Sequence, residues 1–382
     1  MSKKSIYLDN AAATPMDDSV QRSMQPYFSD MFYNPSASYL EAKQVAHHMN
    51  EARHNIAMML GVRPAEIVFT AGGSEANNLA ISGVMQSFPD KHIVVSAVEH
   101  DSVLKPAQRY DYSIAPVQID GRIQLEELRK LITDNTVLVS VMYANNELGT
   151  VMPLRSVAKI IEEVKKDRIK RNIGLPIYFH TDACQAPLYL DVHANRLGAD
   201  LVTLNGSKMY GPKQTGMLYV KTGVQVSPII RGGGQEWNLR SGTENVPGII
   251  GFDTALTNAV KNQDKSNNEL KGLQNYFIEG IKQISGNAVI NGSIAYRLPN
   301  NVHVTFPGVD NERLMMELDE QGIMCAVGSA CSASNDEPSH VLKAIGLSDA
   351  DAQASLRFSM SKHTTKADIN YTLKILKKLI TP

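Results

Sequence analysis

The sequence is poor in cysteine and contains no long hydrophobic run. Only three cysteines occur in 382 residues, Cys184, Cys325 and Cys331, which argues against a disulfide scaffold and for a reducing compartment. No CxxC pair is present, and the ten histidines are scattered without the spacing of a zinc site. There is no run of about 18 apolar residues for a membrane span, and the first residues lack the apolar core of a signal peptide. These absences predict a cytoplasmic protein without a membrane segment or a bound metal.

Neither sign of charge is in excess. The 38 lysines and arginines nearly balance the 39 aspartates and glutamates, so the formal net charge is −1, and no overall attraction to nucleic acid or to an anionic membrane is expected. Hydrophobic residues make up 43% and charged residues 20% of the chain, as is usual for globular proteins. A chain of this length exceeds the size of a single hydrophobic core, which predicts two domains.

Short apolar runs alternate with helical patterns in the first part of the chain. The runs are rich in β-branched residues and lack polar alternation, as strands covered on both faces do. They span residues 66–70, 92–96, 137–142, 177–180 and 201–204, and the helical patterns span residues 74–85 and 154–170. This alternation predicts an α/β fold with a mostly parallel sheet and right-handed crossovers.

The pattern changes after about residue 251. A long helical stretch covers residues 252–284, and the polar run at residues 262–268 is expected to interrupt it. A strand-like segment at 301–306, a helix near 312–321 and a terminal helix from residue 366 follow. We interpret this part as a smaller α+β domain.

Two segments that follow strands have features of a ligand site. In residues 70–75 (TAGGSE) the glycines allow close backbone approach, and the N–H groups of a helix start can bind an anion. The alternative is an ordinary turn with Ser74 as N-cap. Asp182 stands at the end of a strand, where an open parallel sheet faces its ligand crevice. There it can pair with a protonated pyridine nitrogen or cap a helix.

Lys208 and Cys331 are the candidate reactive residues. Lys208 follows a strand in the glycine-containing segment 205–213 and can form a Schiff base in a shaped pocket; the alternative is a solvated loop lysine. Cys331 lies in a Gly-, Ala- and Ser-rich segment that we expect to be a mobile loop, where an exposed thiolate can act as a nucleophile. Cys325 follows two apolar residues and fits a small buried side chain better.

Two arginine-containing segments suit contacts with anions. A Gly-rich stretch leads from Arg231 to Arg240 and Thr243, and such backbone is suited to anion binding. Arg357 can hold a carboxylate with its planar guanidinium. The alternative for Arg357 is a structural ion pair.

Taken in order, these segments resemble the cysteine desulfurases of the class V aminotransferase group, which are fold-type I enzymes of pyridoxal 5′-phosphate (PLP). The resemblance covers nearly the whole chain and includes residues 7–14, 34–38, 70–75, 99–100, 145–149, 182–185, 205–213, 240–243 and 328–331. It implies the PLP-dependent transferase fold of type I, with a mostly parallel sheet in a large domain at residues 15–255. The smaller α+β domain would consist of residues 1–14 and 256–382.

The resemblance also implies roles for individual residues. Lys208 would hold the cofactor and later move protons, His100 would stack on the cofactor ring and assist the acid–base steps, and Cys331 would form a persulfide, so these three are the implied catalytic residues. Asp182 would pair with the pyridine nitrogen, and Gln185 with the phenolic oxygen. The complete set of implied cofactor contacts is Gly73, Ser74, His100, Asn146, Asp182, Gln185, Asn205, Ser207, Lys208 and Thr243, and the implied substrate contacts are Asn146 and Arg357.

The implied activity is the PLP-dependent removal of sulfur from L-cysteine, giving L-alanine and a persulfide on Cys331. The sulfur would pass to an acceptor protein, such as an iron–sulfur scaffold or a tRNA-thiolation enzyme. Thr243 would contact the phosphate of the neighbouring subunit's cofactor, which implies a homodimer. One alternative is a selenocysteine lyase or another class V PLP enzyme. A scaffold without catalysis is a second alternative, which the presence of Lys208 disfavours.

The chain departs from the family pattern at two positions. Many members have Ser-Gly-His before the lysine, where this chain has Asn205-Gly206-Ser207. An imidazole contact to the phosphate is therefore expected to be lost or replaced by the Ser207 hydroxyl. Members also often carry His where Gln235 stands. Neither change removes a catalytic role.

Overall fold

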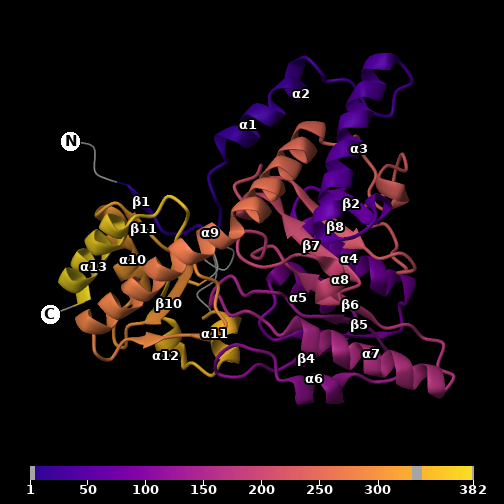
Figure 1. Ribbon diagram of the computed structural model, residues 1–382. Helices are drawn as coiled ribbons and strands as arrows, with labels where there is room; N and C mark the ends of the chain where they lie inside the picture. Colours follow the sequence, from indigo (N-terminus) through magenta and orange to yellow (C-terminus); the bar gives the residue numbers. More distant parts are fainter. Residues whose placement is uncertain (1–4, 329–337, 381–382) are drawn as a thin grey trace.

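The computed structural model describes residues 5–328 and 338–380 of the chain. Its largest element is a seven-stranded sheet with helices packed on both faces (Figure 1). In spatial order the strands are β2 (Ile67–Thr70), β8 (Gly216–Val220), β7 (Leu201–Asn205), β6 (Tyr178–Asp182), β5 (Thr136–Ser140), β3 (His92–Ser96) and β4 (Asp111–Ala115). The five strands from β7 to β4 are parallel, whereas β8 is antiparallel to β7 and β2. The predicted α/β class with a mostly parallel sheet is confirmed.

Side chains on the central strands alternate between two hydrophobic layers. Val94 packs in the layer that contains α3 (Leu40–Leu60), α7 (Leu154–Lys170) and the start of α9 (Val246–Ile284). Ile93 and Val95 pack in the opposite layer, with α4 (Gly73–Ser87) and α5 (Asp101–Ala107). Each fully buried Val or Ile side chain stabilises the fold by roughly 1.5–3 kcal/mol relative to an exposed one. The ends of the strands are therefore fixed in position by the packed sheet.

Shorter elements complete this part of the molecule. They are α1 (Asp18–Met24), α2 (Pro26–Ser29), η1 (Pro64–Glu66), α6 (Leu125–Leu131), α8 (Ala194–Leu197), η2 (Gly206–Lys208) and η3 (Glu236–Asn238). The predicted helices at 74–85 and 154–170 correspond to α4 and α7 and are confirmed.

The long helix α9 is continuous, so the predicted interruption at residues 262–268 is wrong. The polar side chains in that run bond to backbone carbonyls of a neighbouring segment. Gln263 Nε2 donates to the carbonyl oxygens of Pro187 and Leu190 at 3.1 and 2.8 Å, and Asn267 Nδ2 donates to that of Tyr189 at 2.8 Å. Tertiary hydrogen bonds therefore stabilise a stretch whose composition alone suggests a break.

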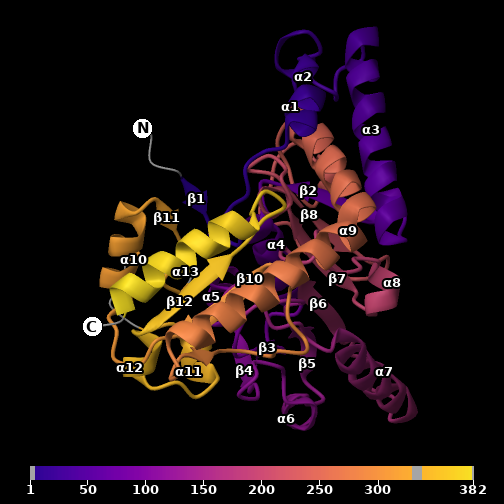
Figure 2. The ribbon, with the colours of Figure 1, turned by 60° about the vertical axis from the view of Figure 1, so that its left-hand side comes forward.

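A second hydrophobic core lies around the C-terminal half of α9. This helix runs from the region of α1 and α3 towards α13, as both views show (Figure 2). A three-stranded antiparallel sheet forms within the last third of the chain, and a parallel pair of strands joins the start of the chain to the same part. The elements are β1 (Ile6–Tyr7), β9 (Val289–Ile290), β10 (Asn301–Thr305), α10 (Asn311–Glu320), β11 (Ile323–Met324), α11 (His340–Ala344), α12 (Asp349–Ala352), β12 (Ser355–Ser359) and α13 (Lys366–Ile380). The predicted strand at 301–306 and helices at 312–321 and from 366 are confirmed. The domain division near residue 255 stays a proposal, because α9 contributes side chains to both cores.

Candidate functional site

A cavity of about 200 Å³ opens at the carboxyl ends of β6 and β7, where a parallel sheet of this kind binds its ligand. We call it the Lys208 cavity. Its walls come from both ends of the sequence and from five helices or strands of the large sheet region. The lining residues are Ala11, Ala12, Gly73, Ser74, Asn77, His100, Ser102, Met142, Asn146, Asp182, Cys184, Gln185, Asn205, Lys208 and Arg357. The predicted cofactor and substrate residues therefore converge on one place, with the exceptions of Ser207, Thr243 and Cys331.

Asp182 is the last residue of β6 and is only 7% exposed. Its Oδ1 accepts a hydrogen bond from the backbone N–H of Cys184 at 2.9 Å, and its Oδ2 accepts one from Asn77 Nδ2 at 2.7 Å. No helix starts at this position, so Asp182 is not a helix cap. A carboxylate that is held by two donors in a cavity presents a fixed negative charge to a ligand.

Lys208 ends the short helix η2, directly after β7. Its Nζ donates a hydrogen bond to the carbonyl oxygen of Ala12, and its positive charge lies close enough to act on the Cys184 thiol. The side chain is half-buried and lines the cavity. Lys208 is therefore directed into the site, and the alternative of a solvated loop lysine is wrong.

The Gly72–Gly73 turn gives the site a surface suited to an anion. Gly72 has a φ of 138° and open space where a Cβ would stand, whereas a Cβ on Gly73 would lie 2.8 Å from Cys184 Sγ. Gly72 is the N-cap of α4 and offers no side-chain cap. Ser74 lies inside the first turn, so its predicted alternative role as N-cap is wrong. Uncapped N–H groups at the start of a fifteen-residue helix attract negative charge.

Ser207 lines an adjoining cavity that shares Gly73, Ser74 and Asn205 with the Lys208 cavity. Its hydroxyl and its backbone N–H both bond to Asn205 Oδ1 at 3.1 Å. The Ser207 hydroxyl thus lies beside the start of α4, where the family pattern places an imidazole. It can replace a neutral donor there but supplies no positive charge.

Arg357 on β12 also lines the Lys208 cavity, with a side chain that is 1% exposed. Its Nη2 pairs with Asp9 Oδ1 at 2.5 Å, and its Nη1 donates to the carbonyl oxygen of Asn146 at 3.1 Å. Arg357 therefore fits both predictions made for it, because it forms a structural ion pair and also lines the cavity where a carboxylate could bind. Gln185 is held in a similar way, because its Nε2 donates to the carbonyl oxygen of Ala11 at 3.0 Å.

His100 is the N-cap of α5. Its Nδ1 lies 2.8 Å from Ser102 Oγ and accepts the Ser102 backbone N–H at 3.1 Å. Ser102 Oγ is in turn 2.8 Å from Asn77 Nδ2. Neither Asn77 nor Ser102 was predicted as a site residue, although a serine two positions after a histidine is a local turn pattern that could have indicated the second contact.

Two buried glutamates lie behind His100 and Asn146. Burial raises the pKa of the Glu99 carboxyl to about 8, while its Oε1 accepts the backbone N–H of Met142 at 2.6 Å. Burial also raises the pKa of Glu147, whose Oε2 accepts the Ser339 hydroxyl at 2.7 Å. Glu99 thus holds the backbone at Met142, which lines the Lys208 cavity, and Glu147 bonds to the N-cap residue of α11. In the described parts of the chain no group of three or more His, Cys, Asp or Glu side chains could hold a metal ion, and no helix is long and apolar enough to span a membrane.

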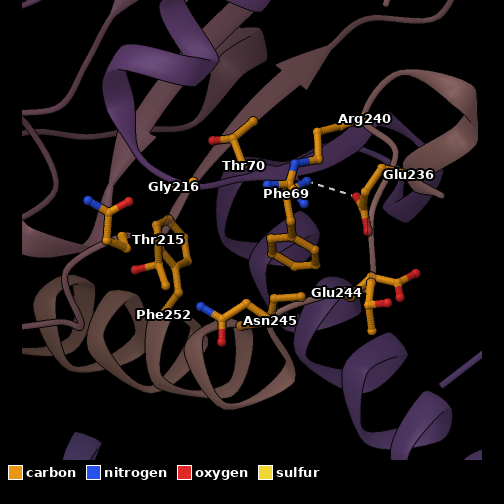
Figure 3. Close-up of a pocket in the computed structure, with 13 residues that line it drawn as sticks. Phe69, Thr70, Thr215, Gly216, Glu236, Arg240, Glu244, Asn245 and Phe252 are labelled. Atoms are coloured by element: carbon orange, nitrogen blue, oxygen red, sulfur yellow. Dashed lines mark hydrogen bonds between the residues drawn. The ribbon is translucent and has the colours of Figure 1, made fainter. Parts of the chain in front are cut away.

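Thr243 lines a separate cavity of about 250 Å³, shown in Figure 3, which lies between β2, the segment around Arg240 and the start of α9. Glu236 closes one side, because its Oε2 accepts the Phe69 backbone N–H at 2.8 Å and its carboxylate pairs with the buried Arg53. Arg240 Nε reaches from this cavity to Glu75 Oε1 in the first turn of α4, at 2.9 Å. Thr243 is thus outside the Lys208 cavity of its own chain. Its predicted contact with the neighbouring subunit's cofactor stays a prediction.

The predicted nucleophile Cys331 lies outside the described residues. The other two cysteines are in surroundings that keep their thiols protonated. Burial raises the pKa of Cys325 to about 12, and burial and the nearby Asp182 charge raise that of Cys184 well above its ordinary value. Cys325 is 9% exposed, in agreement with its prediction as a small buried residue.

Comparisons with known proteins agree over nearly the whole chain. The family model described as aminotransferase class-V matches residues 6–372. The cysteine desulfurase IscS of Dictyoglomus turgidum is 40% identical over 385 residues, covering 99% of this chain and 95% of that protein. Among solved structures, a NifS-like protein superposes with a TM-score of 0.90 at 31% identity and 99% coverage of both chains. SspA in complex with cysteine superposes with a TM-score of 0.82 at 34% identity, covering 94% of this chain and 100% of that one.

Proposed function

This chain belongs to the class-V aminotransferase family and is a cysteine desulfurase, and we propose that it works with PLP held in the Lys208 cavity. The observation that carries this proposal is that Asp182 and Lys208 line one cavity with the uncapped start of α4. Asp182 suits a protonated pyridine nitrogen, the start of α4 and Ser207 suit a phosphate, and Lys208 can bind an aldehyde carbon. When bound, PLP supplies an electron sink for negative charge that develops at the substrate Cα.

The side chains of the cavity can bind the substrate and transfer its protons. Arg357 and Asn146 bind the substrate carboxylate and so place its Cα and Cβ near Lys208. Lys208 Nζ, when it is not bonded to the cofactor, would take the proton from Cα. Asp182 would pair with the pyridine nitrogen of a bound cofactor, and His100, which lines the same cavity, would cover its ring and exclude water there.

The sulfur leaves as a persulfide on Cys331. The Cys331 thiolate bonds to the substrate sulfur, the bond between that sulfur and Cβ breaks, and its electron pair stays on carbon, which is then protonated. The balance is L-cysteine plus enzyme thiol giving L-alanine plus enzyme persulfide. We propose that the protein is a cytoplasmic homodimer. The persulfide sulfur passes to an acceptor protein such as an iron–sulfur scaffold or a tRNA-thiolation enzyme.

The reaction is tested by product analysis. The purified protein, loaded with PLP and given L-cysteine and dithiothreitol, should release L-alanine and sulfide in equal amounts. The same assay with L-selenocysteine separates desulfuration from selenocysteine lysis. Release of alanine from selenocysteine alone, or of pyruvate and ammonia from cysteine, would contradict the proposal.

The Asp9–Arg357 pair leads to a prediction about substrate affinity. A substrate carboxylate must compete with Asp9 for the guanidinium, because Asp9 already neutralises Arg357 at 2.5 Å. Asp9→Asn keeps a hydrogen-bond acceptor but removes the competing charge. We expect its KM for L-cysteine to fall by a factor of about five with little change in kcat, as roughly 1 kcal/mol of screened Coulomb energy gives.

Asp17→Asn is the matched control for this change. Asp17 is also an aspartate of the N-terminal segment paired with a cation, Lys362, at 2.5 Å, but Lys362, unlike Arg357, does not line the Lys208 cavity. Its KM should equal that of the unmodified enzyme. A KM that rises in Asp9→Asn would show instead that Asp9 serves to orient Arg357.

A further inference from the structure

We propose that Asn77 and Ser102 form a hydrogen-bonded bridge that positions Asp182 and His100 as one unit. The proposal deepens the proposed function and rests on it, since it concerns how the Lys208 cavity holds its cofactor. Both bridge residues line that cavity, yet neither is needed for any chemical step described above. They are positioning residues, because they act through the two side chains they join.

Asn77 has only one orientation that fits its neighbours. A carboxylate can only accept hydrogen bonds, so the amide must turn its nitrogen towards Asp182 Oδ2, which lies 2.7 Å away. The second N–H of the same nitrogen then donates to Ser102 Oγ at 2.8 Å. Asn77 is 1% exposed, and its Oδ1 has no partner in the described part of the protein. The residue thus leaves one acceptor unsatisfied while both of its donors are used, which is the arrangement expected of a two-sided donor.

Ser102 passes this orientation on to His100. Because Ser102 Oγ accepts from Asn77, its own hydrogen is free to point at His100 Nδ1, 2.8 Å away. The backbone N–H of Ser102 donates to the same nitrogen at 3.1 Å. With two donors directed at it, Nδ1 carries no proton in the neutral imidazole, and Nε2 carries the proton. The bridge therefore selects which ring nitrogen can exchange a proton in the cavity.

The bridge connects three separate elements. Asn77 stands on α4, four residues after Gly73 in the turn suited to an anion, Ser102 stands on α5, and Asp182 ends β6. Helices α4 and α5 pack against each other on the same face of the sheet. A shift of α4 would therefore move three groups together: the helix start that suits the phosphate, Asp182 and His100. The bridge would thus fix the distance between the groups that bind the two ends of the cofactor.

Substitutions of the two bridge residues should have different effects on PLP affinity and on kcat. Asn77→Ala removes the hydrogen-bond donor to both Asp182 and Ser102. We expect a dissociation constant for PLP that is about tenfold higher and a kcat that is about 100-fold lower. Ser102→Ala loosens only the His100 end. We expect its PLP affinity and KM to stay unchanged, its kcat to fall about tenfold, and the share of the Nδ1-protonated tautomer to rise by a similar factor.

The experiment measures PLP dissociation constants, cysteine kinetics and nitrogen-15 NMR of histidine-labelled holoenzyme, with the His100 signals identified by their loss in His100→Asn. Asn78→Ala is the matched control, since Asn78 is the adjacent asparagine of α4, and its side chain donates to the Ser74 backbone carbonyl at 2.8 Å and does not line the Lys208 cavity. Ser102→Thr retains the hydroxyl and should restore both kcat and the tautomer ratio.

The bridge would be overturned if Asn77→Ala matched Asn78→Ala in PLP affinity, or if Ser102→Ala left the His100 tautomer unchanged. It would equally be overturned if Ser102→Thr behaved as Ser102→Ala. Failure of the proposed function is recognised separately. In that case the unmodified holoenzyme would yield no alanine from cysteine, while PLP affinity and the His100 signals would still report on the bridge.

Discussion

Lys208→Ala should remove the visible absorption of the PLP-loaded protein and lower desulfuration by about 10³-fold or more. The side chain is directed into the cavity, with its Nζ at the Ala12 carbonyl and its charge beside Cys184. No other lysine lines this cavity, so the described chain offers no substitute for the covalent link. The expected loss has two parts, because the proposed function assigns to the same nitrogen both the bond to the cofactor and the removal of the Cα proton.

The measurement is an absorption spectrum, followed by borohydride reduction and peptide mass analysis. In the unmodified protein, reduction should fix the cofactor mass on the peptide that contains Lys208. Lys105→Ala serves as the control, since Lys105 is an exposed lysine in the last turn of α5, and it should keep both spectrum and rate. A Lys208→Ala protein that retained the absorption band would refute the assignment.

The fold was predictable where burial fixes the amino-acid pattern. The β3 segment is fully buried, and its centre, Ile93 to Val95, consists of the β-branched apolar residues that this position demands. Strand β4 escaped prediction because it is an edge strand with Tyr112 37% and Ile114 47% exposed, so no continuous apolar run forms. Strand β8 is fully buried, and its run at residues 217–220 carries a signal that sequence reasoning overlooked.

The site was predictable where functional side chains directly follow strands. Asp182 and Lys208 stand beside such ends, and the carboxyl ends of parallel strands meet at one edge of a sheet. Contacts that depend on tertiary packing could not be derived in this way. Asp9 meets Arg357 across 348 residues of sequence, and Asn77 appears from the sequence as one more polar residue on a helix.

The backbone conformation of residues 236–238 is another feature that could not be predicted from the sequence. Glu236, Trp237 and Asn238 all have positive φ, at 47°, 61° and 64°, a conformation that costs roughly 1–2 kcal/mol per residue. The strain is offset by the Glu236–Arg53 pair at 2.6 Å and by the bond from Trp237 Nε1 to the Ile67 carbonyl at 3.1 Å. A strained backbone held by buried contacts often marks a functional segment. Here it precedes Arg240, whose Nε bonds to Glu75 in the first turn of α4, and Thr243, which lines the cavity of Figure 3.

Cys331→Ser should keep the cofactor spectrum and the binding of cysteine but lower sulfur transfer to below about 1% of the unmodified rate, because a serine hydroxyl is a far weaker nucleophile than a thiolate. Persulfide formation is measured as the mass of one added sulfur atom on the peptide that contains Cys331. The two described cysteines are poor substitutes, since burial raises the pKa of Cys325 to about 12 and raises that of Cys184 as well.

Cys325→Ala separates the two cysteines of that segment. It truncates a buried side chain outside the Lys208 cavity, so we expect a modest loss of stability with sulfur transfer per folded enzyme unchanged. A thermal unfolding curve distinguishes lost folding from lost chemistry in each variant. If Cys331→Ser still transferred sulfur while Cys325→Ala did not, the persulfide would belong to Cys325, and burial would no longer be a sufficient argument for an inert thiol. If neither change had an effect, Cys184 beside Lys208 would be the remaining carrier, and the sulfur would leave from inside the cofactor cavity itself.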